Sequence, residues 1–93
     1  MRTEAMAGLL RVLGHPSRLR ILLALQERQR CVKELMDALG IRQSNLSQHL
    51  RILRDAGVVG CQRRGVEVCY WIQDERALHI IHVTDELLNG RAS

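Results

Sequence analysis

Short polar side chains gather between Arg42 and His49, where the run RQSNLSQH offers amide, hydroxyl and imidazole groups for hydrogen bonding. Such groups suit the edges of base pairs in duplex DNA, because Gln and Asn bond adenine through two hydrogen bonds and Ser bonds several bases. Leu46, Leu50 and Leu53 recur beside them at helical spacing. A helix held by an apolar stripe, with short polar groups at its tip, is what major-groove reading requires. The side chains expected to contact DNA from this helix are Gln43, Ser44, Asn45, Ser47, Gln48, His49 and Arg51.

Two alternatives stay open for this polar cluster. Its members also suit an N-terminal cap followed by a solvated helix face, with Ser44 serving mainly as the cap. His49 also suits a phosphate in place of a base, and Arg51 and Arg54 then lie toward the DNA backbone.

A second basic feature is the pair Arg63-Arg64, which stands directly before Gly65. Apolar residues alternate with other residues beyond Gly65, and this pattern predicts a β-hairpin with its turn at the glycine. Arginines at the tip of a hairpin suit phosphates or a narrow minor groove. The alternative is that they serve solubility, since basic residues are common on exposed turns.

Cysteines and histidines are the candidate metal ligands. Cys61 and Cys69 lie on the two predicted strands, either directly opposed or one residue out of step. Opposed thiols suit a soft metal or oxidation, whereas the alternative is that each free Cys is a small buried apolar residue. His79, His82 and Glu86 share one side of the predicted last helix, and they form a zinc-type set that a dimer would complete. The alternative there is a solvated face with a His82–Glu86 pair at i,i+4.

The elements that position these groups follow from the apolar spacing. Helices are expected over residues 3–13 and again from His15 onward, with the second helix central to the core. A polar connection over residues 27–30 leads to a short helix from Val32 to Leu39, which Gly40 ends. Because three residues including a glycine separate this helix from the polar-tipped one, the two are expected to form a helix-turn-helix.

The predicted fold class is mainly α with a β-hairpin wing: a winged helix-turn-helix of order α-α-α-α-β-β-α in one domain over residues 1–93. Asp74 is expected to cap a last helix that Asn89 and Gly90 close. The first and last helices carry apolar sides that the middle of the chain does not need, so they are expected to pair with each other and with a second copy. Such a homodimer presents two recognition helices roughly 34–36 Å apart, one turn of DNA.

Composition narrows the classes of partner. The chain has 93 residues, 46% of them hydrophobic, and a net charge of +4 in which all basic residues except Lys33 are Arg. Arginine binds phosphate bidentately, which suits nucleic acid. Aromatic residues number only Tyr70 and Trp71, and this argues against single-stranded or RNA platforms. No apolar run approaches the length of a membrane span and the start is not signal-like, so a cytoplasmic protein without a membrane partner is expected. An odd cysteine count also does not fit a secreted disulfide framework.

These features together resemble the ArsR/SmtB family of winged helix-turn-helix repressors. The resemblance covers roughly residues 5–88, and its most specific parts are the segments SNLSQHL and LRDAGVV taken together. Further matching segments are LGHPSRLRIL, the stretch from Val32 to Leu39, and RRG followed by Tyr70. The resemblance implies a small cytoplasmic homodimer that binds palindromic operators and is released by a metal, a metalloid, a sulfide species or an oxidant.

The resemblance also points to Cys31. It stands where members that sense arsenite, cadmium or lead carry the first Cys of a Cys-Val-Cys-Asp-Leu segment, but Lys33 replaces the second Cys. Cys31 would therefore need a thiol or a histidine from elsewhere in the chain. As(III) or a divalent metal is one candidate inducer, and a regulator without any cofactor is the other.

The expected function is a sequence-specific, DNA-binding transcriptional regulator, namely a dimeric repressor of double-stranded operator DNA released by a metal, metalloid or thiol-reactive inducer. The alternatives are a winged-helix module that binds another protein and a ligand-independent regulator. An enzyme is not expected, because no motif accompanies the Cys and His residues and the chain leaves little room for a substrate cleft.

Overall fold

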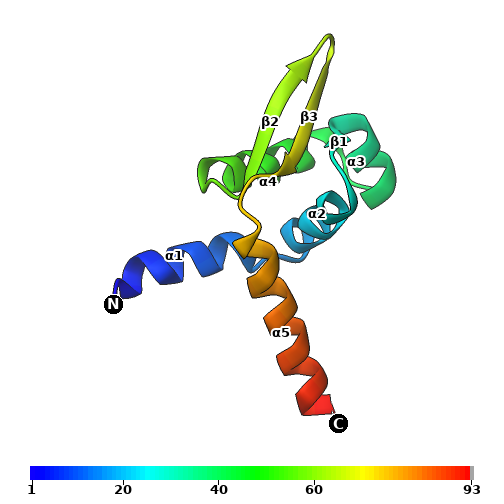
Figure 1. Cartoon of the computed structure of the whole chain (residues 1–93). Helices are drawn as coiled ribbons and strands as arrows, with labels where there is room; N and C mark the ends of the chain where they lie inside the picture. Colours follow the sequence, from blue (N-terminus) through cyan, green and yellow to red (C-terminus); the bar gives the residue numbers. More distant parts are fainter. Residues whose placement is uncertain (93) are drawn as a thin grey trace.

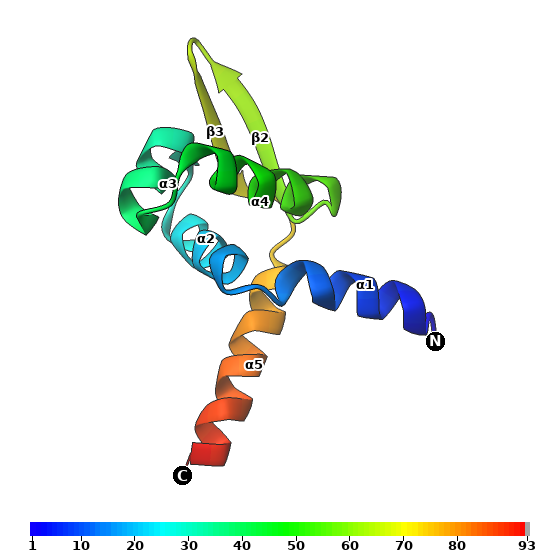
Figure 2. The same ribbon diagram turned by 180° about the vertical axis from the view of Figure 1, so that it is seen from behind.

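The computed structural model describes residues 1–92, so Ser93 of the expected domain lies outside the described residues. The elements follow in the order α1 (Thr3–Leu13), α2 (Pro16–Glu27), β1 (Arg30–Cys31), α3 (Val32–Leu39), α4 (Gln43–Asp55), β2 (Val59–Arg64), β3 (Glu67–Ile72) and α5 (Arg76–Ala92). In both views α1 and α5 extend from the middle of the molecule as two arms, and the hairpin of β2 and β3 stands on the other side (Figures 1 and 2). The predicted winged helix-turn-helix is confirmed.

Two boundaries differ from the sequence-based expectation. The polar connection expected over residues 27–30 ends in β1, a two-residue strand that starts at Arg30 and pairs with β3. The last helix does not end at Gly90 but continues to Ala92. Within residues 1–92, none of the helices is both long and apolar enough to cross a membrane.

Leucines and isoleucines of α2, α3 and α4 form the centre of the core. Six of these side chains are completely buried: Ile21, Leu22, Leu35, Leu46, Leu50 and Leu53. Helix α2 is central, as expected, but it is not buried all round, because Leu23 is 44% exposed. The side of α2 that carries Leu23 therefore faces away from the core, as much of α1 and α5 does.

The junction of α1 and α2 is fixed by local hydrogen bonds. His15 is the N-cap of α2, and its Nδ1 accepts a hydrogen bond from the Ser17 N–H at 3.1 Å. Pro16 occupies the first helical position, where its missing N–H costs nothing. The Arg18 guanidinium donates to the carbonyl oxygens of Arg11 and Val12, at 3.2 and 2.9 Å, so α2 is tied to the end of α1.

The sheet is antiparallel with the order β1-β3-β2. Gly65 turns the hairpin with a φ of 67°, a left-handed conformation that glycine adopts without steric cost. Cys61 pairs with Tyr70 and Gln62 pairs with Cys69. Because neighbouring residues of a strand point to opposite faces, Cys61 and Cys69 lie on opposite faces of the hairpin.

Candidate nucleic-acid interface

The turn between α3 and α4 sets the entry of the polar helix. Gly40 ends α3 with a φ of 63°, and its N–H donates to the Met36 carbonyl oxygen at 2.9 Å. Helix α4 begins at Gln43, and its N-cap is Arg42, whose side chain makes no capping hydrogen bond. The alternative role of Ser44 as the cap is therefore wrong: Ser44 is the second residue of the helix and its side chain is exposed.

Helix α4 has the two sides that the sequence predicted. Leu46, Leu50 and Leu53 are completely buried in the core. The exposed polar side chains near its start are Gln43, Ser44, Asn45, Ser47 and Gln48. An extended N-cap and a buried leucine stripe thus hold a row of short hydrogen-bonding groups out toward solvent.

His49 corrects the expectation of a DNA contact. Its side chain is only 7% exposed, and its Nδ1 accepts a hydrogen bond from Arg18 Nε at 3.2 Å. Its ring centroid lies 4.5 Å from that of His15. Burial, with His15 and the Arg18 charge as smaller causes, lowers the pKa of His49 from its ordinary value. The imidazole is thus an internal acceptor that fastens α4 to α2, and it is turned away from any groove.

The spacing of the leucines could have revealed this position. His49 lies three residues after Leu46 and four before Leu53, so it shares the buried side of the helix. Its polar neighbours in the sequence suggested the opposite side.

Arginines flank this row on α4 and at the wing. Arg51 is exposed and stands 4.0 Å from Asp55, a distance typical of a weak surface pair. Arg54 lies 3.8 Å from the same carboxylate. At the hairpin, Arg63 and Arg64 are exposed and immediately precede the Gly65 turn. Their pairing partners, Val68 and Glu67, place the two arginines on opposite faces of the hairpin.

A groove of about 640 Å³ separates the start of α4 from the wing. Lys33, Gln43, Ser47, Val66 and Tyr70 are among the residues that line it. The helix-turn-helix and the wing therefore border one concave surface, whose lining is largely apolar and includes Lys33, Gln43 and Ser47 together with the acidic Glu67. This arrangement suits a helix in one groove of DNA and a wing against the neighbouring backbone.

The candidate metal ligands are rearranged relative to the expectation. A site shared by Cys61 and Cys69 is contradicted, because these residues lie on opposite faces of the hairpin. His79, His82 and Glu86 are exposed on α5 and do not gather into a three-ligand cluster within residues 1–92. The cluster that does form in this part of the chain contains Cys31, Glu67 and Cys69.

The partner that Cys31 needs from elsewhere in the chain is the thiol of Cys69. The two residues are direct partners of β1 and β3, and their sulfur atoms form a disulfide. Sequence reasoning missed the pair because the cysteines are 38 residues apart and β1 was not predicted.

The comparisons with known proteins agree with this geometry. A sequence model of the bacterial regulatory proteins of the arsR family matches residues 15–60. The crystal structure of Rv0081 from Mycobacterium tuberculosis superposes with a TM-score of 0.87 at 36% identity, covering 98% of this chain and 96% of that one. The chain belongs to the ArsR family. It has the winged helix-turn-helix fold of the regulators in that family.

Other members of the ArsR family have names that state a role. The HTH-type transcriptional repressor SmtB of Mycobacterium tuberculosis is 50% identical over 78 residues, which are 84% of this chain. The chain spans 58% of the length of that relative. The crystal structure of the transcriptional repressor BigR from Xylella fastidiosa has a TM-score of 0.83 at 32% identity, covering 92% of this chain and 88% of that one.

Proposed function

We propose that this ArsR-family chain is a homodimeric repressor that reads a specific operator in double-stranded DNA. The observation that carries the proposal is the groove between α4 and the wing, which is bordered by exposed Gln43 and Ser47 on one side and by the hairpin on the other. The names of its relatives SmtB and BigR, both repressors, support repression over activation. Such a regulator acts where the chromosome is, in the cytoplasm.

The proposed division of labour follows from the exposed groups. Gln43, Ser44, Asn45, Ser47 and Gln48 supply hydrogen bonds to base edges in the major groove. Arg51 and the two wing arginines supply phosphate contacts, which position the protein without reading sequence.

The homodimer is proposed from the arms. Large apolar side chains are exposed on α1, α2 and α5, including Met6, Leu9, Leu10, Leu23, Val83, Leu87 and Leu88. An apolar groove of about 340 Å³ lies between these helices, lined by Leu10, Leu23 and Leu88 among others. Exposed apolar surface of this kind marks an interaction site. A second copy would cover it and place two α4 helices about one turn of DNA apart.

A binding experiment with substitutions tests the reading of DNA. An operator is first selected from a random duplex library, and its affinity is measured by fluorescence anisotropy against competitor DNA. Gln48→Ala is expected to reduce the preference for the selected operator by about 1–3 kcal/mol while leaving binding to random DNA unchanged. If Gln48→Ala weakened both equally, base reading by this residue would be wrong.

The wing is tested by salt dependence. Replacing Arg63 and Arg64 by Gln is expected to weaken binding to all duplexes and to flatten the slope of log K against log salt by about 0.9 for each lost phosphate contact. Arg20→Gln is the control, because Arg20 is an exposed arginine of α2 outside the groove. A chain that selects no duplex at all would favour the alternative of a protein-binding module.

A further inference from the structure

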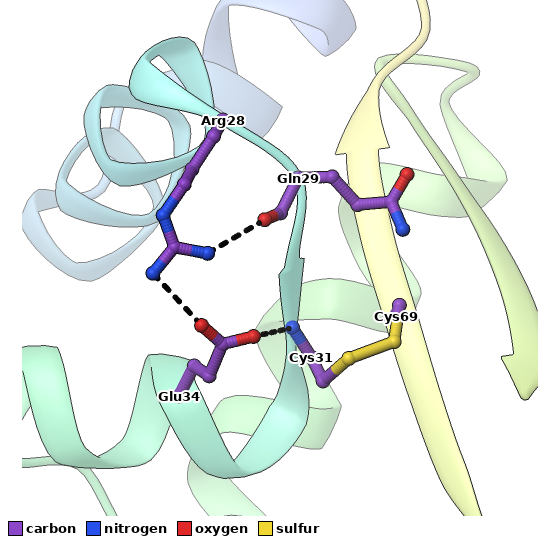
Figure 3. The surroundings of a disulfide bond; sticks show 5 residues. All are labelled: Arg28, Gln29, Cys31, Glu34 and Cys69. Carbon is purple, nitrogen blue, oxygen red and sulfur yellow. Dashed lines mark hydrogen bonds and ion pairs between the residues drawn. A yellow bond between two sulfur atoms is a disulfide. The ribbon is translucent and has the colours of Figure 1, made fainter.

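The Cys31–Cys69 pair joins two elements that border the proposed DNA surface. Cys31 immediately precedes α3, the first helix of the helix-turn-helix, and Cys69 belongs to β3 of the wing (Figure 3). The bond is a covalent link between β1 and β3 of the wing, in addition to their strand pairing.

The two sulfur atoms differ in access and surroundings. Cys31 is half-buried, whereas Cys69 is 2% exposed. Cys31 is also the N-cap of α3, where the helix favours negative charge. Its N–H donates to Glu34 Oε1 at 3.1 Å, and Glu34 in turn pairs with Arg28 at 2.9 Å, so this end of α3 is held in place (Figure 3). Although the Glu67 carboxylate lies beside both sulfur atoms, Cys31 is the more accessible of the two and stands at a helix N-terminus, so we assign it as the attacking thiol and Cys69 as its resolving partner.

A side-chain contact connects β1 with a wing arginine. Gln29 stands directly before β1, on the same face of the sheet as Cys31 and Cys69. With its amide oxygen turned toward the arginine, Gln29 accepts hydrogen bonds from Arg64 Nη1 at 3.1 Å and Nη2 at 3.3 Å. The Arg64 guanidinium is thus folded back along the wing toward β1, away from the tip where a phosphate would lie.

We propose that Cys31 and Cys69 form a reversible oxidation site for hydroperoxides, and that its disulfide weakens DNA binding by holding Gln29 where it retains Arg64. This inference rests on the proposed function and identifies the chemical class of the inducer. In the reduced chain β1 relaxes from β3, Gln29 moves with it, and Arg64 is released to contact phosphate. The oxidised chain is the one that leaves the operator.

The chemistry balances with a hydroperoxide as the oxidant. The Cys31 thiolate attacks the distal peroxide oxygen, the O–O bond breaks, an alcohol or water leaves, and Cys31 becomes a sulfenic acid. The Cys69 sulfur then attacks the Cys31 sulfur, the S–O bond breaks, and the departing hydroxide takes the Cys69 proton as water. Two thiols and one hydroperoxide thus give one disulfide, one alcohol and one water. A dithiol reductant reverses the change by thiol–disulfide exchange through Cys31.

The first measurement follows the thiols without DNA. The full chain is reduced with dithiothreitol, treated with hydrogen peroxide and alkylated, and the cross-linked peptide is identified by mass spectrometry. We expect a Cys31–Cys69 disulfide that dithiothreitol reverses over repeated cycles, with Cys61 remaining alkylatable. A failure of Cys31 and Cys69 to couple under peroxide would overturn the proposal.

The second measurement compares DNA binding of the two forms. The oxidised dimer is expected to bind the selected operator roughly tenfold more weakly, with a salt slope flatter by about 1.8, because two Arg64 phosphate contacts are lost. Gln29→Ala should restore the affinity and the slope of the oxidised form, since nothing then retains Arg64. Equal affinity of the two forms within twofold, or tighter binding after oxidation, would overturn the proposal.

Matched serine variants complete the design. Cys31→Ser keeps a favoured N-cap residue on α3 and is expected to bind DNA like the reduced chain whether or not peroxide is added. Cys61→Ser should respond like the unaltered chain, because Cys61 is the free cysteine on the other face of the hairpin. A peroxide response that persists in Cys31→Ser would overturn the proposal. If neither form of the unaltered chain bound DNA, the proposed function would fail, and the alkylation experiment would still decide the oxidation site.

Discussion

Removing one leucine from the arms is expected to weaken the proposed homodimer about a hundredfold. Leu88 of α5 is 58% exposed, lines the apolar groove between the arms and does not belong to the core. Leu→Ala removes about three carbons, worth roughly 2.4 kcal/mol when fully buried. Since 58% of the side chain is still exposed in one chain, about 1.4 kcal/mol per copy remains to be gained on dimerisation. A two-fold interface contains two copies, so Leu88→Ala loses about 2.8 kcal/mol, or about a hundredfold in dissociation constant.

Sedimentation equilibrium over a range of protein concentrations measures this constant directly. Circular dichroism at each concentration checks that the helices of Leu88→Ala are retained. Val66→Ala is the matched control, because Val66 is 95% exposed at the wing and lies outside the groove of the arms. It removes a similar apolar side chain and is expected to leave the dissociation constant unchanged.

Two results would refute the reasoning. A Leu88→Ala dimer as tight as the unaltered one, within twofold, would show that α5 does not line the interface. An unaltered chain that stayed monomeric at the highest concentrations would remove the dimer itself.

Three further predictions concern stability. Because the disulfide closes a loop of 38 residues, replacing Cys31 by Ser is expected to lower the free energy of unfolding of the oxidised chain by about 4 kcal/mol in urea titrations, and equal midpoints would contradict this. Burial lowers the pKa of His49 in the folded chain, so the unfolded chain binds a proton at this histidine more readily. The contribution of His49 to the free energy of unfolding is therefore fully present above about pH 6.5 and decreases as the pH drops below it. His49→Gln should flatten this decline in thermal unfolding between pH 7 and 5. The Arg76 side chain, and then its N–H, lower the pKa of Asp74 to about 2, so the contribution of this carboxylate is complete above about pH 4 and is lost as the pH falls through 2. An Asp74→Asn variant with the same acid unfolding profile as the unaltered chain would contradict that assignment.

Local spacing predicted the helices because each of them carries apolar residues at helical intervals, whether those residues lie in the core or on the arms. The leucines of α4, from Leu46 to Leu53, are the plainest case, and all three are completely buried. The hairpin was predicted for a similar reason, since alternation on one side of Gly65 is a local pattern. These signals need no knowledge of the rest of the chain.

What the sequence could not show depends on contacts between distant residues. Strand β1 has only two residues and forms through its pairing with β3, so no periodic pattern of apolar residues predicts it. The same pairing brings Cys31 to Cys69, and two cysteines separated by 38 residues carry no local sign of a bond. The partner of His49 is Arg18, which is 31 residues away. In each case a polar or short segment obtained its role from an element that lies elsewhere in the sequence.

Arg18 connects the proposed dimer with the proposed recognition helix. One guanidinium donates to the last carbonyl oxygens of α1 and to the His49 imidazole of α4. The arm that is proposed to hold the second copy and the helix proposed to enter the major groove are therefore fixed to the same side chain of α2. In the proposed dimer this arginine is one of the links between the arm and α4, beside the buried leucines of α4, and the distance between the two α4 helices must match one turn of DNA. The inward turn of His49, which removes it as a DNA ligand, thus makes it part of the connection between α4, α2 and the end of α1.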